Sequence, residues 1–92
     1  MQVNLFATLR QITGRKALEL PLDAGATAGG LLEAVVAQYP ALRAELLDAE
    51  GRLLGHVHLF VNGRDAPYLE QGLATPLSPD DKIDLFPAVG GG

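Results

Sequence analysis

One long stretch of this chain spaces its hydrophobic residues like the buried face of a helix. Within residues 27–39 they recur three or four positions apart, at Leu31, Leu32, Val35, Val36 and Tyr39. Thr27 is a suitable N-cap, and Pro40 ends the helix because it lacks a backbone N–H. Glycines at positions 29 and 30 each cost about 1 kcal/mol against alanine in a helix. Packing, rather than helix propensity, must therefore hold the first turn.

Two segments before this helix alternate with the period of a β-strand. Residues 3–9 place Val3, Leu5, Ala7 and Leu9 on one side, which predicts a first strand with one buried face. Residues 17–22 alternate again, and a turn over residues 11–15 joins the two segments into a hairpin. Pro21 predicts that the second strand lies at an edge of the sheet, because proline cannot donate to a ladder.

The pattern changes again after the helix. Residues 41–47 are predicted to form a short helical turn, and residues 56–61 a third strand. Asn62-Gly63 follows that strand directly and favours a tight hairpin turn, because both residues tolerate a positive φ. Residues 65–71 are then expected to hold a brief fourth strand.

The last patterned segment is residues 82–86, in which Ile83 and Leu85 alternate with other residues and predict a final strand. Pro79, Asp80 and Asp81 precede it and are interpreted as turn residues rather than as a pair of catalytic acids. The order strand, strand, helix, strand, short strand, strand predicts an α+β fold in two layers. Chains connected in this way often form a β-grasp, with one main helix across a mixed sheet of four to five strands.

Composition limits the functions that such a domain can have. The 92 residues are 48% hydrophobic and 20% charged, which suits one small globular domain. The chain has no cysteine, which excludes disulfides, thiolate metal sites and a cysteine nucleophile. Its net charge is −4 without a basic block, so neither nucleic acid nor a membrane is an expected partner. The absence of a signal segment or a long apolar run predicts a cytoplasmic protein.

The last third of the chain resembles the ThiS/MoaD family of ubiquitin-like sulfur carriers from bacteria and archaea. The resemblance rests on the segments Phe60-Val61-Asn62-Gly63-Arg64-Asp65, Gly72-Leu73-Ala74-Thr75-Pro76-Leu77 and Phe86-Pro87-Ala88-Val89-Gly90-Gly91-Gly92, with Asp81 between the last two. It implies a β-grasp domain over residues 1–87 and a flexible glycine-rich tail over residues 88–92. The chain departs from the familiar ending at Gly90, where family members carry alanine or another residue before the terminal glycine pair. Removal of one residue before activation is therefore an alternative.

The resemblance implies that Gly92 is the reactive residue. A C-terminal carboxylate is ionised at neutral pH and is a poor electrophile, so it must be activated. In the family, a ubiquitin-activating-like adenylyltransferase attaches AMP, using ATP and Mg, and a sulfide or persulfide donor then displaces AMP to leave a thiocarboxylate. The carrier itself binds no permanent cofactor and is not an enzyme. Its other implied partner is a synthase that accepts the sulfur.

Glycine suits this tail for a geometric reason. A chain that enters a narrow active site as extended backbone gains from having no Cβ near the attacked carbonyl. Residues 88–92 span roughly 16 Å when fully extended. Ala88, Val89, Gly90 and Gly91 are therefore expected to thread the tail into the active site of a partner.

The residues expected to face the helix are Val3, Leu5, Val57, Leu59, Val61, Ile83 and Leu85. All the phenylalanines of the chain, at positions 6, 60 and 86, alternate out of phase with this set. In a β-grasp sheet the last strand lies between the first and the third, so the three rings are predicted to form an apolar patch on the open sheet face. Exposed aromatic patches often mark a protein contact, which makes Phe6, Phe60 and Phe86 the predicted partner-docking residues. The alternative is a shift of register that turns a ring into the core.

Other polar and aromatic residues are given structural roles. His56 and His58 share one strand face, but no carboxylate or cysteine at suitable spacing completes a metal site, so no metal is predicted. Tyr39 and Tyr68 are interpreted as packing residues.

Several functions remain open at this level. The leading prediction is sulfur donation in cysteine or homocysteine synthesis or in molybdopterin synthesis, where the chain would be the small subunit of a synthase. Thiazole formation and tRNA thiolation are further outlets. The glycine-rich and Pro-Ala-Val segments favour the carriers of amino-acid sulfur assimilation. The alternatives are a modifier that Gly92 joins to lysines of other proteins, and a docking module with an inert tail.

Overall fold

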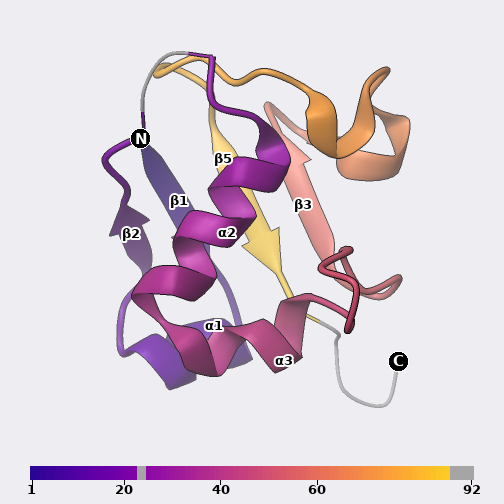
Figure 1. The fold of residues 1–92 in the computed structure, drawn as a ribbon. Coiled ribbons are helices and arrows are strands. Elements are labelled where there is room, and N and C mark those ends of the chain that lie inside the picture. Colours follow the sequence, from indigo (N-terminus) through magenta and orange to yellow (C-terminus); the bar gives the residue numbers. More distant parts are fainter. Residues whose placement is uncertain (23–24, 88–92) are drawn as a thin grey trace.

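The computed structural model describes residues 1–22 and 25–87, and Figure 1 shows their arrangement. The strands are β1 (Gln2–Leu5), β2 (Ala17–Glu19), β3 (His58–Val61), β4 (Arg64–Asp65) and β5 (Ile83–Phe86). They form one five-stranded sheet in the order β2-β1-β5-β3-β4. β1 and β5 are parallel, and the other pairs are antiparallel. This mixed sheet with its central last strand is the predicted β-grasp.

The helices are α1 (Thr8–Thr13), α2 (Ala28–Gln38) and α3 (Arg43–Leu46), with 3₁₀ turns η1 (Pro40–Leu42), η2 (Ala66–Tyr68) and η3 (Gly72–Ala74). α2 crosses one face of the sheet (Figure 1). The hydroxyl of Thr27 accepts a hydrogen bond of 3.0 Å from the Gly30 amide, which confirms the predicted N-cap. A Cβ at Gly29 would lie 3.2 Å from the backbone oxygen of Leu73, so glycine permits the close approach of η3. None of the described helices is long and apolar enough to cross a membrane.

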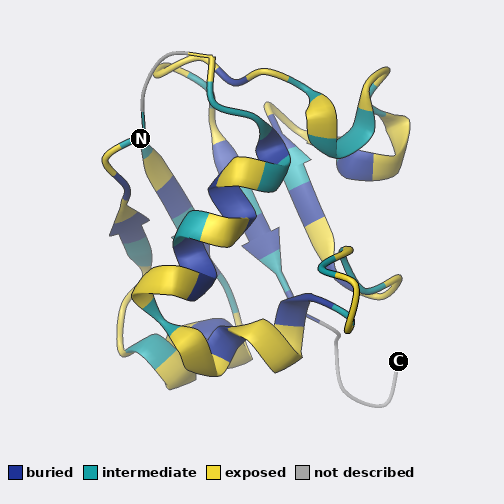
Figure 2. Ribbon diagram, in the orientation of Figure 1, coloured by how far each residue is buried: buried dark blue, intermediate teal, exposed yellow. Residues whose placement is uncertain are grey.

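The core lies between α2 and the sheet, and Figure 2 shows in dark blue the buried residues of both. Its members on the strands and just before β3 are those that the alternation predicted, namely Val3, Leu5, Val57, Leu59, Val61, Ile83 and Leu85. The helix contributes Leu31, Leu32, Val35 and Val36, all buried as predicted. The period of each element therefore identified its inner face, except at Ala7, which was predicted to face the core and is exposed because β1 ends before it.

The first strand is shorter than predicted. β1 ends at Leu5, and the residues expected to continue it or to form a turn make up helix α1. Leu9 is fully buried, as the alternation predicted, but it belongs to α1 and not to a strand. The change of direction occurs at Ala7, which has φ 53° and ψ −127°, and the Leu9 amide donates a 3.1 Å hydrogen bond to the Phe6 carbonyl across the turn. These angles are those of the first central residue of a type II′ turn, which strongly favours glycine.

Substitution of Ala7 by glycine is therefore expected to stabilise the protein. The native backbone holds an L-residue in a conformation that only glycine adopts without strain, and such strain costs on the order of 1–3 kcal/mol. Glycine also adds entropy to the unfolded chain, which offsets part of the gain. We expect a net rise of about 1 kcal/mol in the free energy of unfolding, measured by urea denaturation. Gly14→Ala is the converse control: Gly14 has φ 71°, so alanine there should lower stability.

The predicted fourth strand is also wrong beyond Asp65. β4 stops there because Pro67 cannot donate to a ladder, and the Asp65 carboxylate instead accepts a 2.9 Å hydrogen bond from the Ala66 amide at the start of η2. Tyr68 follows in η2 with 77% of its surface exposed, so its predicted packing role is wrong. Tyr39 does pack against the core. β2 and β3 have shorter hydrogen-bonded ladders than predicted, and β2 does lie at an edge.

The predicted hairpin turn at Asn62-Gly63 is confirmed, with φ 53° and 84°. The Asn62 side chain also bridges to the start of β5: its oxygen accepts from the Lys82 amide at 2.8 Å and its nitrogen donates to Asp81 at 2.9 Å. The other carboxylate oxygen of Asp81 accepts from the Ser78 amide at 2.7 Å. Asp81 is thus a turn residue, as predicted.

Candidate functional site

The predicted reactive tail leaves the domain from the middle of the sheet. β5 lies between β1 and β3 and ends at Phe86, and the next residue, Pro87, is buried. Gly92 and the predicted threading residues 88–91 lie outside the described residues. The described part of the candidate site is therefore the surface around the end of β5.

Three phenylalanine rings lie together at this end of β5. The rings of Phe6 and Phe86 stack with centroids 4.1 Å apart and planes 9° apart. Phe60 meets Phe86 edge to face, with centroids 5.5 Å apart and planes 89° apart. Both are favourable geometries for aromatic pairs. We call Phe6, Phe60 and Phe86 the aromatic face.

The register of the sheet explains why these rings meet. β1 and β5 pair with Leu5 opposite Leu85, so the next residue of each, Phe6 and Phe86, lies side by side. Phe60 pairs with Asp84 on the antiparallel neighbour, which places its ring diagonal to Phe86. Leu5 and Leu85 are fully buried toward α2, whereas each ring is only partly buried. The structure thus places all three predicted residues together on the open face of the sheet.

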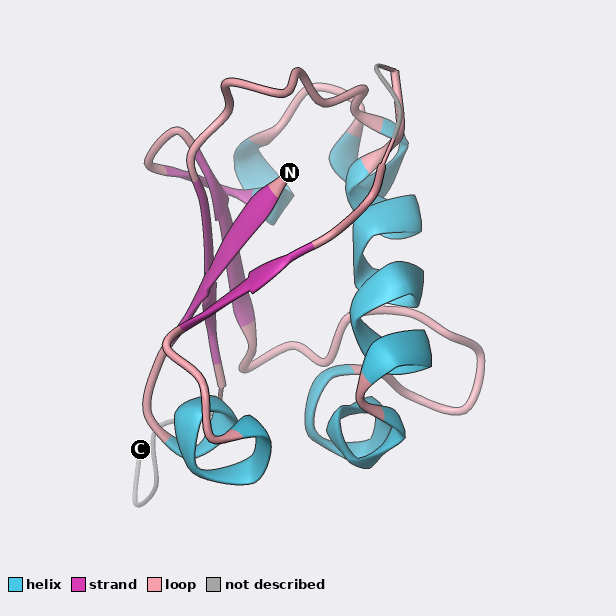
Figure 3. Cartoon of the chain, turned by 90° about the vertical axis from the view of Figure 1, so that its left-hand side faces the viewer, coloured by secondary structure: helices cyan, strands magenta, loops and turns pink. Residues whose placement is uncertain are grey.

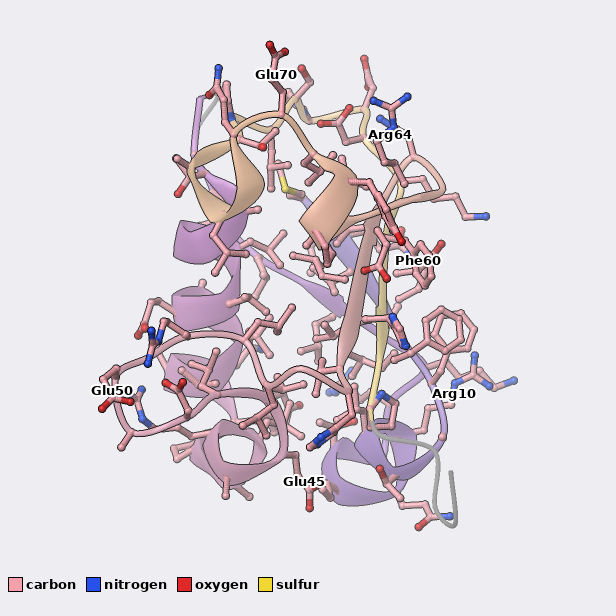
Figure 4. All side chains as sticks on the ribbon, turned by 90° about the vertical axis from the view of Figure 1, so that its right-hand side faces the viewer. Arg10, Glu45, Glu50, Phe60, Arg64 and Glu70 are labelled. Atoms are coloured by element: carbon pink, nitrogen blue, oxygen red, sulfur yellow. The ribbon has the colours of Figure 1, made fainter. Side chains whose placement is uncertain are left out.

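Two polar side chains border the aromatic face. The Arg10 guanidinium, on α1, lies 4.7 Å from the centre of the Phe6 ring, and its Nε donates a hydrogen bond to the Leu5 carbonyl. The His58 ring lies 5.9 Å from that of Phe60 and nearly parallel to it. Figure 4 shows Arg10 and Phe60 on the same side of the sheet. The face is therefore apolar with a cation at its rim.

The sequence pattern does not single out Arg10, because it predicts a strand over residues 3–9 and a turn over residues 11–15. The signal for α1 was the spacing of Leu9 and Ile12 before Thr13-Gly14, since a glycine that follows hydrophobic residues three apart is a helix stop. With this helix in place, Arg10 is four residues after Phe6 and reaches back over its ring.

Farther along the open face the side chains are polar. The Asn4 amide donates a 2.9 Å hydrogen bond to Asp84, and the Lys82 ammonium lies 3.8 Å from the other oxygen of that carboxylate. The open face of the sheet therefore has an aromatic end, next to the start of the tail, and a polar end. The aromatic end adjoins Pro87, the last described residue before the predicted tail.

The two histidines do not share a site. His58 is in β3, and its Nδ1 lies 2.7 Å from an Asp65 carboxylate oxygen across the hairpin, whereas His56 precedes the strand and is exposed. Within residues 1–22 and 25–87, no three histidine or acidic side chains lie close enough together to hold a metal ion. His58 is therefore best described as the partner of Asp65 at the border of the aromatic face.

Comparison with known proteins identifies the family of this chain. A sequence model described as the ThiS family matches residues 3–92. The chain belongs to the ThiS family. Members of this family are small ubiquitin-like modifiers and sulfur carriers, and they are not enzymes. They work with activating enzymes of the ubiquitin-activating type.

Three relatives illustrate the range of the family. Small archaeal modifier protein 3 of Haloferax volcanii is 35% identical over 92 residues, which cover 100% of this chain and 98% of the relative. The sulfur carrier protein CysO of Mycobacterium tuberculosis is 33% identical over 70 residues, or 74% of each chain. The crystal structure of an Amycolatopsis orientalis BexX/CysO complex contains a chain with a TM-score of 0.79 and 28% identity, covering 99% of this chain and 98% of that one.

Proposed function

We propose that this ThiS-family protein is a sulfur carrier whose Gly92 carboxylate is converted to a thiocarboxylate. The observation that carries the proposal is the family match, which extends through the glycine-rich tail to residue 92. The similarity to a sulfur carrier, CysO, supports it. The sulfur would serve biosynthesis of cysteine or homocysteine, or of molybdopterin.

The chemistry takes two steps, both on a partner enzyme. The Gly92 carboxylate first attacks the α-phosphorus of ATP, which forms an acyl-adenylate and releases pyrophosphate. A sulfide or persulfide sulfur then attacks the carbonyl carbon, the bond to AMP breaks and AMP leaves with the electron pair. With sulfide, the product is the thiocarboxylate directly; with a persulfide, a thiol must also cleave the remaining S–S bond and become part of a disulfide. ATP and Mg belong to the activating enzyme.

We further propose that the aromatic face binds the activating enzyme and the sulfur-accepting synthase. Its three rings are partly exposed, contact one another and adjoin the end of β5, from which the tail leaves. Aromatic side chains at the centre of a contact often provide much of the binding free energy. The Arg10 guanidinium at the rim favours a partner with a carboxylate opposite it.

The intact mass of the protein purified from its native cell tests the carrier function. A thiocarboxylate is heavier than the carboxylate form by the difference between a sulfur and an oxygen atom. Alkylation of the thiocarboxylate adds the mass of the alkyl group. We expect both masses to appear, and to disappear in cells that lack the activating enzyme. A single carboxylate mass in cells grown under sulfur limitation would contradict the proposal.

A second candidate is protein modification, favoured by the full-length similarity to a small archaeal modifier protein. Here a lysine amine of a target would attack the activated Gly92 carbonyl in place of sulfur, forming an isopeptide bond and releasing the activating group. The same cell extract distinguishes the two. Tryptic peptides of other proteins that carry a C-terminal remnant of this chain on lysine show modification, whereas the heavier free form shows sulfur transfer.

A further inference from the structure

The outer edge of β2 has unpaired backbone groups. β2 is the last strand on its side of the sheet and pairs only with β1. The Lys16 carbonyl accepts from the Leu5 amide at 2.8 Å, and the Leu20 amide donates to the Met1 carbonyl, just before β1, at 2.7 Å. The alternate residues, Ala17 and Glu19, therefore direct their N–H and C=O groups away from the sheet. Within residues 1–22 and 25–87 these groups have no backbone partner beyond β2. Such an edge is a template for a further strand.

A groove runs beside this edge, on the helix side of the sheet. It has a volume of about 520 Å³ and lies between the end of β2 and α2. Leu20 and Leu22 line it from the strand side, and Ala34 and Ala37 from the helix. In Figure 3, β2 is seen from its free edge with α2 beside it. The small alanine side chains leave room for side chains of another chain.

The charges around the edge sum to a positive value, although the protein as a whole carries −4 and Glu19 lines the groove. Arg15 and Lys16, just before β2, are exposed and form no ion pair among the described residues. The Glu19 carboxylate lies 3.1 Å from the N-terminal ammonium, which balances its charge. The single charged residue of α2, Glu33, lies 3.8 Å from the Arg43 guanidinium of α3. The helix wall of the groove is therefore uncharged.

We propose that the β2 edge and this groove bind an extended segment of a partner protein, which adds a strand to the sheet. In strand addition, backbone hydrogen bonds provide affinity and pockets for alternate side chains provide specificity. Here Ala17 and Glu19 supply the backbone bonds, and the ladder ends at Pro21, which has no N–H. Alternate aliphatic side chains of the segment occupy the groove, and flanking carboxylates lie beside Arg15 and Lys16.

This site is separate from the aromatic face. The groove opens on the α2 side of the sheet and at the β2 edge, whereas the three rings lie on the opposite side over β1, β5 and β3. A partner can therefore bind the β2 edge whatever becomes of the tail, and the proposal stands whether the protein carries sulfur or modifies other proteins.

The test is titration of the ¹⁵N-labelled full chain with a blocked peptide, Asp-Asp-Val-Ile-Val-Ile-Asp-Asp, followed by amide chemical shifts. We expect saturable shifts in residues 17–22 and along the α2 wall, with no saturable shift at the aromatic face. The same peptide with N-methyl groups on alternate residues should bind at least about tenfold more weakly, because it cannot donate to the edge. Shifts centred on Phe6 and Phe60, or no saturable shifts, would overturn the proposal.

A matched pair of variants locates the binding. Ala37→Glu places a charge in the groove at an exposed helix position, where glutamate is a good helix former. Ala44→Glu makes the same change on the exposed surface of α3 and equals it in net charge. We expect Ala37→Glu to weaken peptide binding at least about tenfold relative to Ala44→Glu, because a carboxylate in the groove is either desolvated without a partner or excludes the aliphatic side chain. Equal affinities for the two variants would contradict the assignment of the groove.

Discussion

Removal of Gly91 and Gly92 is expected to abolish thiocarboxylate formation, the largest effect predicted for this chain. The truncated protein still ends in a carboxylate, but that group lies about 7 Å closer to the domain when the tail is extended. A nucleophile held that far from the α-phosphorus of ATP cannot react, since productive attack needs the reacting atoms about 3–3.5 Å apart. The measurement is the intact mass after incubation with the activating enzyme, ATP and sulfide.

The domain itself supplies the control for this truncation. The truncated protein retains every described residue, so its thermal unfolding and its binding to the activating enzyme should match those of the full chain. Loss of the heavier mass with retained binding assigns the defect to the tail. Formation of a thiocarboxylate on the truncated chain would contradict the assignment of Gly92.

Removal of Gly92 alone tests whether the third glycine is trimmed before activation. The shortened chain ends in Val89-Gly90-Gly91, which is the glycine pair typical of the family. If Gly92 reacts as it stands, the shortened chain should react much more slowly, because its carboxylate falls about 3 Å short. Equal rates, together with a thiocarboxylate mass one glycine lighter in the native protein, would show that trimming precedes activation.

Alternation and helical spacing predicted most of the fold because they indicate which side chains become buried on folding. Val3, Leu5, Ile83 and Leu85 are buried as predicted, and their outward-facing neighbours include Phe6 and Phe86. The aromatic face follows from the same alternation once the strand order is known. Its rings could therefore be predicted from the sequence as a group, although their stacking could not.

The errors arose where a single residue changes the direction of the backbone. Ala7 adopts a positive φ that no local propensity predicts for alanine, so a pattern that continues to Leu9 was interpreted as strand. Tertiary packing fixes this turn, since Leu9 enters the core from α1. Because α1 was not predicted, the sequence pattern did not indicate that Arg10 lies over the Phe6 ring. The predicted fourth strand ends early for a simpler reason: Pro67 has no N–H to donate to a ladder.

The proposed function assigns recognition to the aromatic face and chemistry to the tail. The aromatic face lies where β5 ends, so a partner bound there receives the tail at a fixed starting point. The tail then needs little affinity of its own, which suits a tail that ends in three glycines. Variants of the face should therefore raise the concentration of carrier needed for activation, while variants of the tail should lower the rate at saturation.

Phe86→Ala tests this separation most directly, because its ring contacts both other rings of the face. We expect kcat/KM for pyrophosphate release by the activating enzyme to fall at least about 30-fold, the loss typical of a residue at the centre of a contact. The fall should come from a higher KM for the carrier, with kcat at saturation little changed. Varying the carrier concentration in a pyrophosphate-release assay gives both constants.

Tyr68→Ala is the matched control for this substitution. It removes another aromatic ring, which is exposed on η2 and stacks with none of the three rings of the aromatic face, so activation should stay near that of the unchanged protein. Thermal unfolding of both variants shows whether the fold survives, and Phe60→Ala, which removes one ring contact with Phe86, is the substitute if Phe86→Ala unfolds. An unchanged KM in a folded variant of the aromatic face would mean that the partner binds elsewhere, and the position of the rings beside the tail would then have no part in recognition.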